Sequence, residues 1–187
     1  GGGILLDSDG STKDAFGAVI ENCHFKNCVV TANDGRTGGA IYWPSAGGSW
    51  QVLIRGNRFY KNEADIVVVG TGGGVIQDVV IKDNIFSGPI ASVDVNIYVG
   101  GSGVSGLIID NNVFTALPGL SAGQVKRFVF LTGSVGILSN NSFASNDATF
   151  KVSGTAGEVP ATMFMAGNYQ ESTDAVGTFG SLTGRSS

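Results

Sequence analysis

Charged residues are scarce in this chain, and no long hydrophobic run is present. Charged residues make up 14% of the 187 residues and apolar ones 42%, which excludes a disordered, highly charged chain and predicts a folded one. The 11 Lys and Arg residues are scattered and the net charge is −4, so the basic footprint of a nucleic-acid-binding protein is missing. Apolar runs such as Ile66 to Val69 are far shorter than the roughly 20 residues of a membrane-spanning helix. We therefore expect neither a nucleic acid nor a membrane as partner.

Cysteine and histidine are equally rare. Cys23 and Cys28 flank the only histidine, His24. Zinc needs about four ligands and no second Cys/His pair exists, so we predict no metal site and no cofactor. Free thiols and a local disulfide are both compatible with this spacing, and we favour free thiols.

Glycine, by contrast, is abundant, with 30 glycines against 4 prolines. The glycines lie beside short apolar runs, which is typical of tight turns between short strands. We predict one all-β domain over 1–170, followed by a polar exit segment over 171–187. Because the chain opens with glycines rather than Met, we expect it to be part of a longer protein.

An internal repeat runs through the chain. Each copy alternates aliphatic with other residues up to an aromatic anchor and continues with a second apolar run that mostly ends in Gly, and the better copies place Asn two residues before the anchor. The anchors recur at intervals of 34, 27, 28, 29 and 26 residues, at Phe25, Phe59, Phe86, Phe114, Phe143 and Tyr169. Period-two alternation indicates strands, so each coil is predicted to contain a strand, an Asn-bearing corner, a strand and a Gly-bearing corner. Such coils stack in parallel as a solenoid.

The repeated Asn has a physical explanation. A sharp corner between strands needs a residue that tolerates left-handed dihedral angles, and Asn does so better than other non-glycine residues. Stacked in parallel, the side-chain amides would bond from coil to coil as a ladder. Its members are Asn57, Asn84, Asn112 and Asn141. Cys23 takes this place in the first copy and Gly167 in the last, so the ladder is predicted to end there.

The segments VLIRGNRF, VVIKDNIF, LIIDNNVF and GILSNNSF resemble the repeats of the pectate-lyase-like superfamily. This resemblance, from about residue 17 to residue 169, implies an all-β, right-handed parallel β-helix (solenoid) of about six coils. The chain is most similar to a fragment of a bacteriophage tailspike, which implies a side-by-side homotrimer in a virion tail or another extracellular fibre. The Asn-Thr-Asp, Gly-His-Gly and Arg-x-Pro-x-x-Arg motifs of the pectin-degrading branches are absent from the sequence.

Two functions follow from the resemblance. The first is a β-helix segment of a phage tailspike or surface fibre that binds a bacterial polysaccharide. Whether the whole protein also cleaves that polysaccharide does not follow from the sequence. Such an enzyme would be a polysaccharide hydrolase or lyase. The alternative is a purely structural β-helical stalk or adhesin spacer without a catalytic site.

Candidate site residues lie in and around the segments that follow the aromatic anchors. Glu63 and Asp65 would lie about 6.5 to 7 Å apart if they shared one face of a strand, a separation that suits an inverting glycosidase. Asp94 occupies nearly the same position in the next repeat as Glu63 and Asp65 do in theirs. The competing interpretation is that these acids mark the polar corner before a strand. The carbohydrate-binding candidates are Trp50, Tyr60, Lys126 and Arg127, and further aromatic faces come from Tyr42, Trp43 and Tyr98.

Alternation also assigns the faces of the first strand in each repeat. The residues predicted to point inward are Ile20, Ile54, Ile81, Ile109 and Leu138. One outward column is polar, and we expect ion pairs between Glu21 and Arg55 and between Lys82 and Asp110. The other is aliphatic and consists of Val19, Leu53, Val80, Ile108 and Ile137. A continuous outward stripe of this kind favours an interface with other copies of the chain.

Overall fold

The computed structural model describes residues 3–6, 15–29, 40–45, 49–70, 76–88, 95–101, 104–115, 127–132, 134–144, 151–154 and 163–171. All regular secondary structure in these ranges is β-strand. The same part of the chain contains no helix that could cross a membrane. Two predicted site residues, Asp94 and Lys126, lie outside the described residues, as does the predicted exit segment apart from Glu171.

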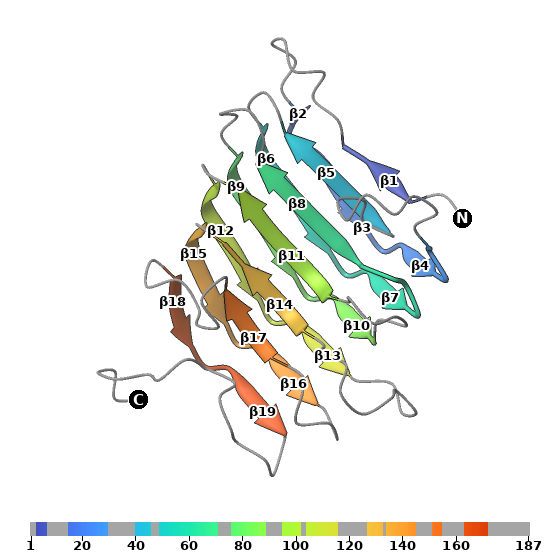
Figure 1. The fold of residues 1–187 in the computed structure, drawn as a ribbon, viewed down its shortest axis with the longest axis vertical. Helices are drawn as coiled ribbons and strands as arrows, with labels where there is room; N and C mark the ends of the chain where they lie inside the picture. The colour runs from blue at the N-terminus through green and yellow to red at the C-terminus, as the bar shows by residue number, and fades with distance from the viewer. Residues whose placement is uncertain are drawn as a thin grey trace.

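The strands form three parallel sheets, which successive segments of the chain visit in turn (Figure 1). Sheet A contains β1 (Ile4–Leu5), β5 (Ile41–Ser45), β8 (Ile66–Gly70), β11 (Val95–Gly101), β14 (Arg127–Leu131) and β17 (Lys151–Gly154). Sheet B contains β2 (Ala15–Phe16) and β3 (Val19–Glu21), which both pair with β6 (Ser49–Arg55), then β9 (Ile76–Lys82), β12 (Val104–Asp110), β15 (Ser134–Ser139) and β18 (Met163–Ala166). Sheet C contains β4 (His24–Lys26), β7 (Arg58–Tyr60), β10 (Ile85–Ser87), β13 (Val113–Thr115), β16 (Ser142–Ala144) and β19 (Tyr169–Glu171). This all-β architecture is consistent with a parallel β-solenoid.

A complete repeat contributes three strands rather than the two predicted. The aromatic anchor occupies a strand of its own, and in β7 the buried Phe59 lies between Arg58 and Tyr60, which point outward. A strand this short has a single inward residue. In the sequence, that residue cannot be told apart from the alternating pattern of the strand before it. The Asn-bearing corner therefore joins sheets B and C, and a second corner joins sheets C and A.

The inward side chains of the three sheets form one hydrophobic core. In sheet C, neighbouring anchor rings stack with centroids 4.7 to 5.0 Å apart, at Phe25, Phe59, Phe86, Phe114 and Phe143. This distance matches the spacing of adjacent strands, about 4.8 Å. The predicted inward column is confirmed, because Ile20, Ile54, Ile81, Ile109 and Leu138 are all buried.

The last repeat is shifted by one residue from its predicted register. β16 and β19 pair with Ser142 opposite Tyr169 and Phe143 opposite Gln170. Tyr169 is therefore no anchor, and its side chain is 63% exposed. Aligning this repeat on its aromatic residue was wrong, because the hydrogen bonds of Asn168 set the register.

Several strands of sheet B contain a residue in the left-handed conformation. In β6 and β9 these residues are Gln51 and Asp78, with φ of 60° and 55°. β15 has one residue fewer than β12 in this region, so the register of the two strands shifts between Val104 and Leu107. There Gly136 lies so close to Leu107 that a Cβ atom would overlap the Leu107 carbonyl oxygen. Only glycine fits this position without a backbone shift.

Candidate functional site

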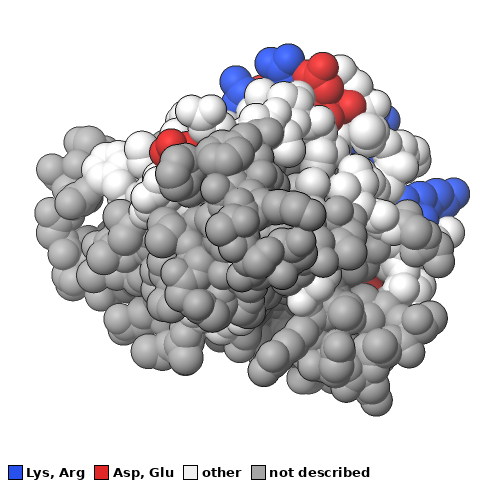
Figure 2. Space-filling view, turned by 90° about the horizontal axis from the view of Figure 1, so that it is seen from above, with Lys and Arg blue, Asp and Glu red and all other residues white. Residues whose placement is uncertain are grey.

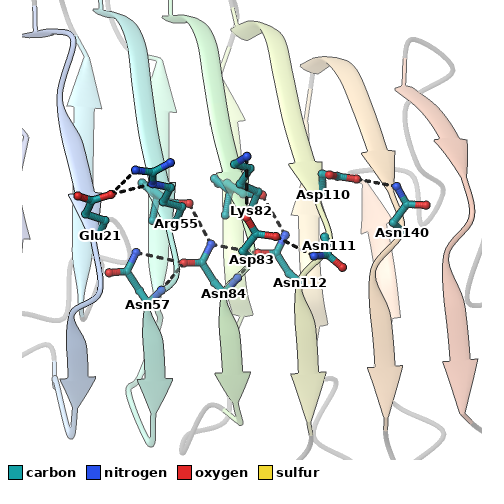
Figure 3. A network of polar contacts seen from close by, with 12 residues as sticks. Glu21, Arg55, Asn57, Lys82, Asp83, Asn84, Asp110, Asn111, Asn112 and Asn140 are labelled. Carbon is teal, nitrogen blue, oxygen red and sulfur yellow. Dashed lines mark hydrogen bonds and ion pairs between the residues drawn. The ribbon is translucent and has the colours of Figure 1, made fainter.

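A ladder of buried amides holds the corner between sheets B and C (Figure 3). The backbone N–H and the Nδ2 of Asn84 both donate to Oδ1 of Asn112, each at 3.0 Å. The Nδ2 group also donates to the carbonyl oxygen of Ile54 at 3.0 Å. Ladder members with this donor pattern are Asn57, Asn84, Asn112 and Asn141. Each amide thereby satisfies its hydrogen-bonding capacity although it is buried.

The ends of the ladder differ from each other. At the first repeat, the backbone N–H of Cys23 donates to Oδ1 of Asn57 at 2.9 Å, so Cys23 takes the ladder position as predicted. At the last repeat, Asn168 accepts both bonds from Asn141 at 3.0 Å. The prediction that Gly167 takes the ladder position was therefore wrong.

The left-handed residue of this corner precedes the ladder residue. The residues with positive φ are Asn22, Gly56, Asp83, Asn111, Asn140 and Gly167, at 51° to 64°. All six are exposed. The prediction that the ladder Asn itself is left-handed was wrong, because two neighbouring residues divide the two roles. The first tolerates the dihedral angle, and the second provides the buried amide.

An outward row of charged and polar side chains follows the same corner. Arg55 Nη2 lies 2.7 Å from Glu21 Oε2, and Arg55 Nε donates to the same oxygen at 2.7 Å. The predicted ion pair between adjacent coils is therefore confirmed. Seen from above, basic and acidic side chains lie side by side at one rim of the molecule (Figure 2).

The predicted ion pair between Lys82 and Asp110 does not form. Lys82 Nζ lies 3.9 Å from Asp83 Oδ2, within its own coil. Asp110 Oδ1 instead accepts hydrogen bonds from Ser139 Oγ at 2.7 Å and from Asn140 Nδ2 at 2.9 Å. Both donors belong to the following coil, so Asp110 is satisfied on the side away from Lys82.

The structure does not bring the predicted acid and base together at an exposed surface. Asp65 is 1% exposed, and its two oxygens accept hydrogen bonds from Asn62 Nδ2 at 2.7 Å and from Asn96 Nδ2 at 2.6 Å. Glu63 is half-buried, and both acids precede β8 rather than lying in it. The spacing rule for one face of a strand therefore does not apply to them. This geometry fits the interpretation that the acids mark a corner, and we assign no acid–base role to Asp65.

The buried cluster of Asn62, Asp65 and Asn96 was not predicted from the sequence. Asn62 Oδ1 accepts from the backbone N–H of Cys28 at 2.9 Å, and its Nδ2 donates to the carbonyl oxygen of Phe25 at 3.2 Å. The available signal was its position three residues after an anchor, the same as that of Cys28. Within the described part of the chain, the buried Asn96 Oδ1 has no hydrogen-bond partner.

The two cysteines are free thiols, as predicted, although only Cys28 is buried and Cys23 is exposed. Burial raises the pKa of the Cys28 thiol, and the nearby charge of Asp65 acts in the same direction. Within the described ranges, no three His, Cys, Asp or Glu side chains gather as a metal site would require.

Tyr60 is the only predicted carbohydrate-binding residue whose side chain is described. It is half-buried on the outward side of β7. Lys26 Nζ lies 5.8 Å and Lys61 Nζ 5.4 Å from the centre of its ring. Trp50 and Arg127 belong to β6 and β14, and their side chains lie outside the described part.

The other aromatic candidates divide between the inside and the outside of sheet A. Trp43 is fully buried in the core, so it offers no face to a ligand. Tyr42 and Tyr98 are half-buried on the outward side. The ring of Tyr98 stacks on that of Phe130, with centroids 5.5 Å apart.

Comparison with models of protein families, with curated proteins and with solved structures found no match to this chain. The chain is all-β with parallel sheets, an architecture compatible with a β-helix.

Proposed function

We propose that the chain is a right-handed β-helix segment of a phage tailspike or surface fibre, related to the pectate-lyase-like superfamily, and that it binds a bacterial polysaccharide. The observation that supports this proposal best is the outward position of Tyr60 on β7. Its ring projects outward from a sheet whose corners are held by hydrogen-bonded amides. An aromatic ring in a fixed position packs against the apolar face of a sugar at a low cost in conformational entropy.

The surroundings of Tyr60 suit a linear ligand. In sheet C, Tyr60 pairs with Ser87, and Ser87 pairs with Thr115. Thr115 in turn pairs with Ala144. The outward column that begins at Tyr60 therefore continues with short side chains over three further strands, spaced about 4.8 Å apart. A polysaccharide that packs on the ring has space to continue along this column.

The test is a binding measurement with Tyr60→Ala. Purified capsular and O-antigen polysaccharides are titrated into the protein and the dissociation constants are compared. We expect Tyr60→Ala to weaken binding about tenfold, as for the loss of an aromatic contact residue. Tyr169→Ala, which removes an exposed tyrosine from the same sheet, is the matched control and should bind like the wild type. Equal affinities for the two variants would contradict the role of Tyr60.

A structural stalk is the second candidate function. It is favoured by the burial of Asp65 with both oxygens bonded to amides. A stalk would retain no polysaccharide from the panel, whereas the binding segment retains at least one. Cleavage, as a hydrolase or a lyase, remains a proposal for the whole protein and is assigned to no described residue.

Side-by-side association as a homotrimer is also part of the proposal. The aliphatic column of sheet B lies on the outside, where Val19 is 55% and Ile137 39% exposed. β18 extends it with Phe164, which pairs with Ile137 and is 46% exposed. Contiguous exposed apolar surface is typical of an interface.

A further inference from the structure

We propose that the first strands of sheet C carry a binding site for the anionic groups of a linear glycan, formed by Lys26, Arg58 and Lys61 around Tyr60. This inference rests on the proposed function and specifies its ligand class, a polysaccharide with carboxylate or phosphate groups.

The register of β4 and β7 brings these residues together. Lys26 pairs with Tyr60, and His24 pairs with Arg58. Paired strands lie about 4.8 Å apart, and outward residues of one strand lie about 6.5 to 7 Å apart. Lys61 follows Tyr60 directly, with a φ of 53°. Three cationic side chains thus emerge close to Tyr60, from β4, from β7 and from the residue that follows β7.

These cations lack acidic partners in the described part of the chain. Lys26, Arg58 and Lys61 are all exposed. The ion pairs described there involve other cations, because Arg55 pairs with Glu21 and Lys82 lies near Asp83. Neighbouring like charges are unfavourable for folding. A local excess of positive charge in a chain of net charge −4 therefore indicates a surface that binds an anion.

The two ammonium groups of the site lie near the ring of Tyr60. Both lie within 6 Å of its centre, at 5.8 and 5.4 Å, the range of a cation–π contact. Arg58 adds a planar guanidinium that binds a carboxylate or a phosphate with two hydrogen bonds. The site thus combines an aromatic face for a sugar ring with cations for its anionic group.

The experiment compares two double variants that remove the same kinds of charge. Arg58→Gln/Lys61→Gln removes cations of the proposed site, whereas Arg55→Gln/Lys82→Gln removes an arginine and a lysine that have acidic neighbours. Each protein is titrated by calorimetry with three probes: alginate oligosaccharides, a poly(glycerol phosphate) and neutral dextran. Circular dichroism checks that the strand signal is kept. Should a double variant lose that signal, the single variants Arg58→Gln and Arg55→Gln replace the pair.

We expect the wild type to bind one of the two anionic probes, more weakly as salt screens the charges, and to bind dextran far more weakly. The probe that binds identifies the carboxylate or the phosphate as the ligand group. The site variant should lose about fivefold or more in affinity, and the control less than about twofold.

Three results would overturn the inference. Equal losses in the two double variants would assign binding to the overall charge, and tighter binding of a DNA oligonucleotide of matched charge would exclude a glycan-selective site. Binding of dextran that neither salt nor the site variant affects would remove the site but leave the proposed function standing. The function itself fails if the wild type binds no polysaccharide, whether these probes or the capsular and O-antigen panel.

Discussion

Asn57 and Asn84 are joined twice across two coils. The backbone N–H and the Nδ2 of Asn57 both donate to Oδ1 of Asn84, at 2.9 and 3.1 Å. A single amide oxygen thus fixes both the backbone and the side chain of the preceding coil. Because 27 residues separate the two in the chain, this contact exists only when the coils stack in register.

Asn84→Ala is expected to destabilise the domain by about 1 to 3 kcal/mol. The substitution leaves the Asn57 donors and the Ile54 carbonyl oxygen buried without their partner. Equilibrium unfolding in denaturant measures the loss. Ser142→Ala removes an outward hydroxyl from β16 and should change the free energy of unfolding by less than about 0.5 kcal/mol. Similar losses in both variants would contradict the role of the ladder.

Gly136→Ala is expected to cost at least about 3 kcal/mol or to prevent folding. The added Cβ would overlap the carbonyl oxygen of Leu107, and the register shift between β12 and β15 leaves it no space. Gly17→Ala is the informative control, because none of the described residues lies within 4 Å of its Cβ position. Its positive φ alone should cost about 1 to 2 kcal/mol. Thermal unfolding followed by circular dichroism ranks the two, and the reverse order would contradict the packing at Gly136.

Asp65→Ala is expected to destabilise the protein by about 2 to 4 kcal/mol, because it removes the acceptor of the buried Asn96 Nδ2 group and one of the two acceptors of Asn62 Nδ2. A catalytic carboxylate at an exposed site would be replaced at little cost in stability. Asp110→Ala, which removes an outward acid with two side-chain donors, should cost less than about 1 kcal/mol. Chemical unfolding of both variants decides between these roles for Asp65.

The two thiols are expected to react at different rates with a disulfide reagent such as DTNB. Cys23 is exposed, whereas burial protects Cys28 and raises the pKa of its thiol, so less of it is thiolate at a given pH. One equivalent should therefore react rapidly at neutral pH and the second only on unfolding. The Cys23→Ser variant isolates the slow phase. Rapid reaction of that variant in the folded state would contradict the burial of Cys28.

The same raised pKa predicts weaker folding at alkaline pH. The folded state favours the protonated Cys28 thiol, so its contribution is complete below the pKa of the unfolded thiol. It is lost as the pH rises through the higher folded value. A Cys28→Ala variant should lose this part of the pH dependence of its unfolding free energy.

Ile108→Asp is expected to yield monomers if rods associate through the aliphatic column of sheet B. A charge in an apolar interface is strongly unfavourable, while the half-exposed position lets the strand persist. Light scattering on the wild type and the variant measures the oligomer. Thr115→Asp, which adds the same charge to the outward side of sheet C, should leave the assembly unchanged. A monomeric wild type at micromolar concentration would contradict the trimer.

The repeated chemistry of the chain was sufficient to predict its stacked core. Asn stands two residues before Phe in successive copies, and an Ile or Leu stands three residues before that Asn. Such positions carry the same or a similar side chain in most coils, so in-register stacking satisfies these copies together. The phenylalanine stack and the amide ladder at Asn57 to Asn141 were predictable for this reason. The ion pair of Glu21 with Arg55 was predictable because the same register places opposite charges on adjacent strands.

The tertiary structure alone decided the contacts that the repeat does not specify. The corners between strands differ in length, and these lengths decide which groups of neighbouring coils lie opposite each other. Three features depend on this: the division into three sheets, the register of Tyr169 and the burial of Asp65. Asp110 bonds to Ser139 and Asn140 rather than to Lys82 because the following coil brings two donors within 3 Å of its carboxylate. Sequence by itself therefore determined the period and the inward faces, since hydrophobic burial acts on every copy alike. The partners of the polar groups depend on distances of a few ångströms, which only the folded chain sets.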